Sequence, residues 1–336
     1  MIRLLRTVFI LFFTTGLIAQ AQIQDTYTVR GIAVDESAES VLEAQRQAFA
    51  TAKLLGAQRM IRRITLPEDL RNADGLIIDQ AVAERISAAV DVEEETRGAG
   101  RYRGSLAVVF NPAEVRALLN AQGIAFTDQS APTALVVPIA NPSLEFDWGE
   151  AWPDQSQGFL AKTVTSRSFG YSAQSEWEEL LGDVAIYGAQ RAVIAELGGI
   201  EGAYYSIVTV VTASGRRSLG RTQRVATMEE AATATGFVLD AAWKESAVVR
   251  ETGRTMIKAT VFYTSLAEWN TLRRALAESP LVSDFQTEAV ARDGAVVRFI
   301  FAGDGQRLTS DLLDRGVTIS ADTIGWVLRS AVTSAR

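Results

Sequence analysis

The sequence predicts an α+β or α/β fold made of three small sandwiches of helices on mixed sheets, the last of them ferredoxin-like. Segments in which apolar and polar residues alternate, as in strands, are interspersed with segments in which apolar residues recur every three or four positions, as on one face of a helix. The chain has 336 residues, which is more than a single hydrophobic core usually serves. Turn-forming residues near 129–132 and 250–253 predict domains at 22–131, 132–252 and 253–336.

The first predicted domain combines one long helix with a short antiparallel sheet. Alanines at 44, 48 and 52 lie on one face of a helix expected from Val41 to Ile64, and such small residues allow close approach to a sheet. Asn111 is the expected N-cap of a later helix, because Pro112 follows at its first position. The other expected elements are a strand over Thr26–Val34, a helix over Ile77–Val90, and a hairpin of Val92–Thr96 with Tyr102–Phe110.

The second predicted domain is built around an apolar strand. Leu135–Ile139 is an unbroken apolar run, which is typical of a strand buried on both faces. Thr227, with Glu230 three residues later, forms a capping box that predicts the start of a helix. The remaining expected elements are a long irregular segment after Ile139, a strand over Ala192–Glu196, and a hairpin of Tyr204–Thr212 with Leu219–Val225.

The third predicted domain has the element order of a split βαβ sandwich. Ser265 caps its first helix, with Glu268 three residues later. A second helix carries leucines at 308, 312 and 313. The expected strands are Met256–Tyr263, Phe285–Ala291, Val296–Phe301 and a last one near Trp326–Leu328. Strand, helix, two strands, helix and strand in this order indicate a ferredoxin-like fold.

The first residues have the pattern of a secretory signal peptide. Arg3 and Arg6 precede an apolar run from Val8 to Ala19, which is too short to cross the roughly 30 Å of a bilayer core. The run ends in a small-x-small motif, Ala19-Gln20-Ala21, that signal peptidase recognises. We therefore expect residues 1–21 to be removed after Ala21, the mature chain to lie in the periplasm, and no transmembrane segment to remain.

Composition narrows the chemistry. The sequence contains neither Cys nor His, so it has no disulfide, no thiolate nucleophile and no imidazole base or metal ligand. No arrangement typical of a catalytic site is recognisable among the remaining residues, and we expect a protein that is not an enzyme and needs no cofactor or metal. The formal net charge is −7, and it becomes −9 when Arg3 and Arg6 leave with the signal peptide. This charge does not favour nucleic acid as a partner.

A tryptophan-rich segment is the first candidate for a binding site. Asp147, Trp148, Glu150, Trp152 and Asp154 combine aromatic rings that can stack on sugars with carboxylates that can act as acid and base on a glycosidic bond. The hypothesis is a loop that binds glycan or a partner. The alternative, which is the commoner arrangement, is that the rings pack in the core while the acids face water.

A basic helix face is the second candidate. Arg59, Arg62 and Arg63 recur at helical spacing and could bind anionic headgroups or phosphate. The alternative is a solvated helix face, on which such residues have no ligand.

The order of several short patterns resembles that of a known family. The patterns include Tyr27-x-Val29-x-Gly31-Ile32, the alanine-spaced helix, Arg101-Tyr102 and Val136-Val137-Pro138. In this order, from about Thr26 to Val317, the chain resembles domain of unknown function 2066, a family of bacterial envelope proteins. The first domain also resembles the N-terminal domain of a flagellar assembly protein and small outer-membrane lipoproteins, and the second is similar to the first domain of the Tol-system translocation protein. The resemblance implies scaffold or assembly work at the envelope and supplies no catalytic residues.

These observations lead to one expected function and one alternative. We expect a periplasmic, non-catalytic scaffold or assembly factor of the cell envelope that binds other envelope proteins, since small sandwiches offer sheet edges to partner strands. The alternative is a protein that binds peptidoglycan, or a carboxylate-dependent glycosidase, centred on Trp148.

Overall fold

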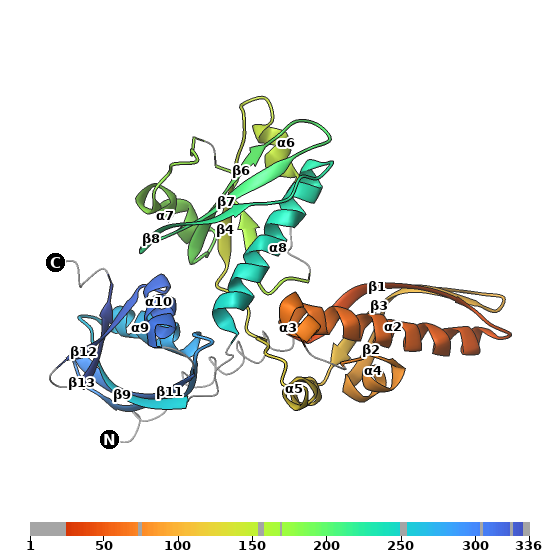
Figure 1. Ribbon diagram of the computed structural model, residues 1–336, viewed down its shortest axis with the longest axis horizontal. Coiled ribbons are helices and arrows are strands. Elements are labelled where there is room, and N and C mark those ends of the chain that lie inside the picture. Colours follow the sequence, from red (N-terminus) through yellow and green to blue (C-terminus); the bar gives the residue numbers. More distant parts are fainter. Residues whose placement is uncertain are drawn as a thin grey trace, which may run out of the picture. The chain divides into compact units, whose positions relative to one another are not determined.

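The computed structural model describes residues 25–72, 76–153, 158–168, 170–248, 254–302, 305–322 and 325–331. They form an α+β protein with three sheets (Figure 1). The chain divides into two compact units between Ser130 and Ala131. The second unit contains two of the three sheets, and its division into two domains stays a prediction. The expected cleavage site after Ala21 and the expected boundary at 250–253 lie outside the described residues.

The first unit is a three-stranded antiparallel sheet covered on one face by a long helix (Figure 1). The strand order is β1-β3-β2, and α2 packs along the sheet. The elements in chain order are β1 (Thr28–Ser37), α2 (Val41–Ile64), α3 (Pro67–Asn72), α4 (Gln80–Ile86), β2 (Ser87–Gly98), β3 (Arg101–Phe110) and α5 (Pro112–Ala121).

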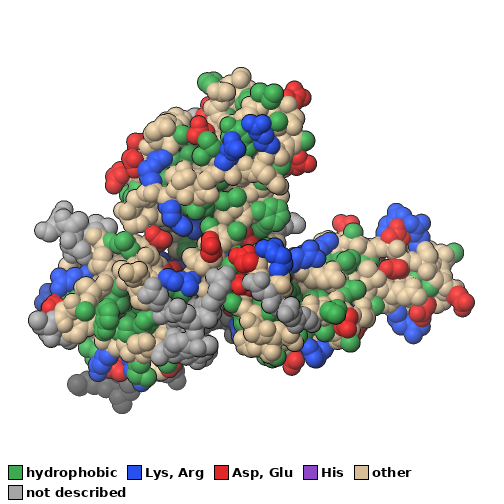
Figure 2. Space-filling view, viewed as in Figure 1, with side chains coloured by type: hydrophobic (Ala, Val, Ile, Leu, Met, Phe, Trp, Pro, Cys, Tyr) green, Lys and Arg blue, Asp and Glu red, His purple; other side chains and the backbone are tan. Residues whose placement is uncertain are grey.

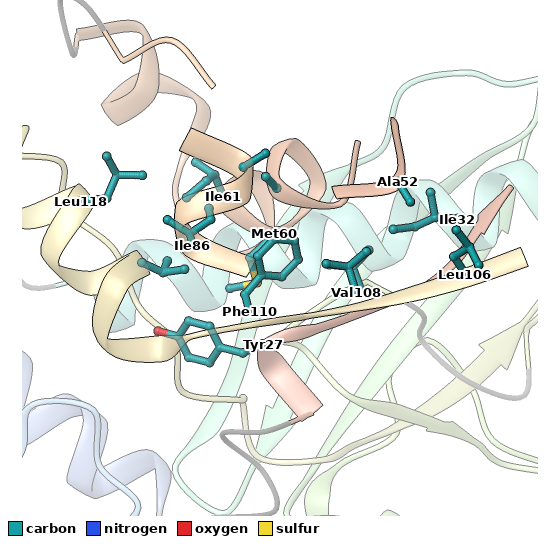
Figure 3. Packing of buried hydrophobic residues seen from close by; sticks show 14 of the residues in the cluster. Tyr27, Ile32, Ala52, Met60, Ile61, Ile86, Leu106, Val108, Phe110 and Leu118 are labelled. Carbon is teal, nitrogen blue, oxygen red and sulfur yellow. The ribbon is translucent and has the colours of Figure 1, made fainter. Parts of the chain in front are cut away.

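Small residues explain how closely α2 lies on this sheet. Ala44, Ala48 and Ala52 are fully buried, as the alanine spacing predicted. One turn further, Gly56 lies so near the sheet that a Cβ atom there would be 3.0 Å from Ile32 Cδ1 and 3.1 Å from Phe110 Cζ. Figure 3 shows large side chains of the sheet and of α2 filling the space beside this stripe. The stripe therefore sets the distance between the helix and the sheet.

One predicted helix of the first unit is wrong in its second half. The helix expected over Ile77–Val90 is α4, which ends at Ile86, and Ser87 begins strand β2. Ser87 pairs with Phe110, so the backbone at this point bonds to β3 instead of continuing the helix. The apolar spacing could not reveal this partner, because β3 lies more than ten residues further along the chain. The hairpin and the Asn111 cap that follow were predicted correctly.

The first sheet of the second unit is mixed and has helices on both faces (Figure 1). Its order is β5-β4-β6-β7-β8, in which β4 is parallel to β5 and β6, while β6, β7 and β8 are antiparallel neighbours. The elements are β4 (Ala134–Ile139), α6 (Glu145–Glu150), β5 (Thr163–Thr165), α7 (Trp177–Ile186), β6 (Arg191–Gly198), β7 (Tyr205–Thr212), β8 (Gly215–Arg221) and α8 (Met228–Ala247).

The central strands of this sheet are buried on both faces. Val136 of β4 packs in the core beneath α6 and α8, whereas its neighbours Leu135 and Val137 pack in a second core with α7. This double burial explains the unbroken apolar run. The segment after Ile139, expected to be irregular, contains α6, β5 and α7, and the second strand of the hairpin begins at Gly215, four residues before the expected start.

The second sheet of this unit is ferredoxin-like with one strand added. Helices α9 and α10 connect the strands in the split βαβ order, and the apolar side chains pack into a single core. The last strand, β13, inserts between β9 and β12, so that the sheet order is β10-β11-β9-β13-β12. The elements are β9 (Arg254–Phe262), α9 (Leu266–Ala277), β10 (Val282–Val290), β11 (Gly294–Ala302), α10 (Gly305–Asp314), β12 (Val317–Asp322) and β13 (Gly325–Ser330).

Strand β12 was not predicted from the sequence. Its residues Thr318, Ser320 and Asp322 are polar, and it pairs only with β13 at the edge of the sheet. Across the described ranges of the chain, every helix is too short or too polar to span a bilayer.

Candidate functional site

The tryptophans of the proposed binding loop are part of the core. Residues 145–150 form helix α6, and Trp148 is fully buried, with its Nε1 donating a hydrogen bond of 2.9 Å to the carbonyl oxygen of Ala195. Trp152 is 6% exposed and meets Trp148 edge to face, with ring centroids 5.2 Å apart. Neither ring of this pair offers a face to a sugar, so their placement does not favour the glycan hypothesis.

The acids of the same segment are separate from the rings. Asp147 and Glu150 are exposed, and Glu150 forms an ion pair with Arg167. Asp154 lies outside the described residues. The segment therefore has the arrangement given above as the alternative, with aromatic rings inside and carboxylates in water.

The three arginines of the predicted basic helix face do not share one role. Arg63 donates from Nη1 to the carbonyl oxygens of Thr26 and Thr28, at 2.8 Å each, and so ties α2 to the start of β1. Arg59 and Arg62 are exposed on the same helix. The structure thus gives Arg63 a structural role and leaves two arginines of the predicted patch at the surface.

Two buried carboxylates also hold structural positions. Asp240 accepts the backbone N–H groups of Leu160 and Ala161, at 2.7 and 3.3 Å, and forms an ion pair of 2.7 Å with Lys244. Asp183 accepts a hydrogen bond of 2.8 Å from the Ser166 hydroxyl. Each carboxylate fixes a segment that has little regular structure of its own. No group of three or more acidic residues that could hold a metal ion occurs in the described part of the chain.

One cavity of the second unit is lined by arginines. It has a volume of about 950 Å³ and is bordered by the β7–β8 hairpin and by helices α8, α9 and α10. Among the described residues, three carboxylates, Glu278, Asp311 and Asp314, line it together with six arginines. The arginines are Arg191, Arg216, Arg217, Arg274, Arg307 and Arg315. On the face of the molecule that Figure 2 shows, blue basic and red acidic side chains are interspersed.

Two of these arginines have structural partners. Arg216 donates to the carbonyl oxygens of Ala173 and Ser175, which lie just before α7. Arg307 donates from Nη2 to three carbonyl oxygens at the end of α8, those of Glu245, Ser246 and Val248, at 2.7 to 3.2 Å. These contacts orient α7 and α10 around the cavity.

Arg191, at the start of β6, has no such partners. Its Nε and Nη2 atoms are buried and make no hydrogen bond within the described part of the chain. Burial and, to a smaller extent, the positive charges of Arg217 and Arg315 together lower the pKa of Arg191 to about 10, while Asp314 acts in the opposite sense. The pKa remains well above neutral pH, so the side chain carries its charge inside the protein.

Arg315 has hydrogen-bond partners for only part of its guanidinium group. Its Nε donates to both carboxylate oxygens of Asp311, at 3.2 Å each, whereas its buried Nη2 has no hydrogen-bond partner among the described residues. The guanidinium lies 5.9 Å from the centre of the Trp243 ring, within cation–π range. Asp314 accepts a hydrogen bond of 3.2 Å from Ser214 on the hairpin. The residues that line the cavity therefore include buried guanidinium donors without hydrogen-bond partners in the described chain, next to the Trp243 ring.

This arrangement can bind an anion. A guanidinium group offers two parallel N–H donors that match the oxygens of a carboxylate or a phosphate. The arginines come from β6, β8, α9, α10 and the residue after α10, and segments so far apart in the chain do not form a pattern from which the cluster could be predicted. The available signal was the adjacent pair Arg216-Arg217 beside a turn in a chain of net negative charge.

No protein-family model matches the chain, and no curated protein matches it either. The resemblance to domain of unknown function 2066, and that of the middle of the chain to the Tol translocation protein, stay predictions.

Proposed function

We propose that this chain is a non-catalytic scaffold or assembly factor of the bacterial cell envelope, which acts in the periplasm by binding other proteins. The location is supported by the signal-peptide pattern before Gln22. The binding role is supported by one feature above all, the exposed edge strands of the two sheets in the second unit. An edge strand presents backbone donors and acceptors that a strand from another protein can pair with.

Strands β8 and β10 are the edges in question. Each lies at the end of its sheet, with a neighbour on one side among the described strands. Most residues of both strands are exposed, and Val290 of β10 leaves 59% of its surface in water. A partner strand added to either edge would continue the sheet.

The alternative, glycan binding or cleavage, lacks comparable support. It needs the rings of Trp148 and Trp152 at the surface, and both pack in the core. The buried carboxylates of the described chain bond to backbone amides, to a hydroxyl or to a lysine. Such fixed roles are typical of structural groups.

Photo-crosslinking in the native bacterium tests the proposal. A photoreactive amino acid replaces Ser218 on β8, Thr287 on β10, or Glu179 on α7 as a control that is also exposed but not on a sheet edge. We expect adducts of discrete mass at Ser218 or Thr287 and none at Glu179. Mass spectrometry of the adducts identifies the partner. A protein that gives no adduct at either edge, or equal adducts at all three positions, would contradict binding through the sheet edges.

A further inference from the structure

The arginine-lined cavity contains a buried arginine whose unpaired donors do not stabilise the fold. Arg191 buries a charge whose Nε and Nη2 find no acceptor in the described chain. Leaving buried donors unpaired is unfavourable by about 1–3 kcal/mol, and more for a charged group. An apolar side chain of similar length would avoid this. The arrangement becomes favourable once a ligand supplies the missing acceptors.

The lining indicates which kind of anion fits. Beside the guanidinium groups, the cavity wall contains apolar and aromatic side chains, including Trp177, Leu239 and Trp243. Its volume of about 950 Å³ lies at the upper end of the range of about 300–1,000 Å³ that is usual for ligand pockets. A small inorganic anion would leave most of this wall without contacts. A ligand that carries a carboxylate next to apolar groups would use both parts.

The position of the cavity favours a peptide. Gly215, Arg216, Arg217 and Leu219 of the edge strand β8 line it, so a chain that lies along β8 runs beside residues of the cavity lining. Arg217 is exposed there, and its charge acts on Arg191 inside. An acidic side chain that projects from such a peptide would meet the guanidinium groups of this lining.

We propose that this cavity binds an acidic peptide segment of a partner protein, with a carboxylate held by Arg191 and Arg315 and neighbouring apolar side chains packed against Trp243 and Leu239. The inference rests on the proposed function, because it assigns to the same edge of the sheet the chemistry of the partner. Two of the three carboxylates that line the cavity already have partners: Asp311 is bonded to Arg315, and Asp314 accepts a hydrogen bond from Ser214.

Peptide binding to the full chain tests this assignment. The probe is a fluorescent six-residue peptide of alternating Leu and Glu with blocked termini, and its twin has Gln in place of Glu. Fluorescence anisotropy is measured at constant ionic strength, because salt screens exposed charges. We expect the Kd of the Glu peptide to be at least about tenfold lower than that of the Gln twin, since charge-assisted bonds are about twice as strong as neutral ones.

Three substitutions locate the site. Arg191→Met removes the buried fork and should raise the Kd of the Glu peptide by about tenfold or more. Arg217→Gln changes only an exposed side chain and should raise it by about threefold, through a lower association rate. Arg292→Gln removes the same charge from an exposed turn away from the cavity and should leave the Kd within about twofold.

Folding is followed in parallel by the melting temperature. Arg191→Met removes an uncompensated buried charge, so the unliganded variant should melt no lower than the parent protein. Arg191→Lys keeps the charge but loses the planar fork, and it should bind the Glu peptide about threefold to tenfold more weakly. If Arg191→Met does not fold, Arg191→Lys and Arg217→Gln still decide the question.

Several results would overturn the proposal. Equal binding of the two peptides, unchanged binding by the variants at 191 and 217, or an equal loss in Arg292→Gln would each contradict an acidic-peptide site. Binding of inorganic phosphate with no peptide binding would indicate a site for small anions instead. Crosslinking to a partner that survives Arg191→Met would leave the proposed function standing while this assignment fails. Absence of any crosslinked partner would instead count against the proposed function, whatever the peptides do.

Discussion

At the scale of single residues, Gly56 shows how the absence of a side chain lets a helix lie close to a sheet. A Cβ atom on residue 56 would lie 3.0 Å from Ile32 Cδ1 and 3.1 Å from Phe110 Cζ, which is closer than ordinary van der Waals contact, so a larger side chain requires these neighbours or α2 to shift. We expect Gly56→Leu to lower the free energy of unfolding by about 1–3 kcal/mol, as overpacking of a filled core does. Chemical denaturation measures this change. Gly149→Leu, at a helical glycine whose Cβ position has no neighbour within 4 Å, should not lower stability, because leucine has a helix propensity better than that of glycine by about 0.5–1 kcal/mol.

Asp35 gives a prediction about pH. Hydrogen bonds from Arg101, at 2.7 and 2.6 Å, hold the pKa of Asp35 at about 2, and Arg103 adds to the effect. Because the pKa is lower in the folded protein than in the unfolded chain, the pair stabilises the fold above the ordinary pKa of an aspartate and loses this effect as the pH falls through about 2. NMR titration of the Asp35 carboxyl should show the low midpoint. In Arg101→Gln the midpoint should rise, and an unchanged midpoint would contradict the assigned cause.

The placement of single residues was the least predictable aspect of the site. The segment around Trp148 has the same composition whether its rings face water or the core, and only the neighbouring Ala195 carbonyl and the α8 layer decide. For Arg191, nothing in its local sequence indicates that Arg217 of β8 and Arg315, the residue after α10, lie close enough for their charges to act on it. Such clusters depend on contacts between distant segments, and periodicity describes near neighbours alone.

At the scale of elements, local signals predicted helix starts well. Thr227 and Glu230 form the predicted capping box, with Glu230 N–H donating to the Thr227 hydroxyl at 3.2 Å, and Ser265 caps α9 in a similar way. These signals operate within three residues, so the sequence contains all of the information. Strand β12 was not predicted, and the second half of the helix expected over Ile77–Val90 was predicted wrongly. In both places the strand is determined by its pairing with another strand.

Helix α8 also gives a prediction, through its buried ion pair. Asp240 bonds to Lys244 and to two backbone amides of the segment at 160–161. Asp240→Ala should lower the free energy of unfolding by about 3–5 kcal/mol, because it leaves a buried lysine without its counter-charge. Thermal and urea unfolding check this value. Glu245→Ala, on the exposed face of the same helix, should change it by less than about 0.5 kcal/mol.

At the scale of the whole molecule, the division of the second unit can be tested with fragments. The last sheet has a core of its own, made by β9 to β13 with α9 and α10. We expect the fragments 22–252 and 253–336 to fold separately and to keep amide-exchange protection in their strands. Neither should bind the acidic peptide, since the cavity takes residues from both. Loss of protection throughout the strands of either fragment would show that the cores depend on each other.

Export gives a second prediction at this scale. The chain recovered from the periplasm should begin at Gln22, because the small-x-small motif ends at Ala21 and no cysteine follows that could carry a lipid. N-terminal sequencing of the protein from periplasmic and membrane fractions measures this directly. An intact N-terminus in the membrane fraction would contradict both the cleavage and the proposed location.

The place of β13 in the last sheet has a consequence for the order of assembly. This strand is made after β12, yet it lies between β12 and β9 and is the parallel neighbour of β9. Until residues 325–330 are available, β12 has no neighbour to pair with, and only β10, β11 and β9 can form a sheet. A chain that crosses a membrane in an unfolded state, amino end first, would therefore complete this sheet only after residues 325–330 have crossed.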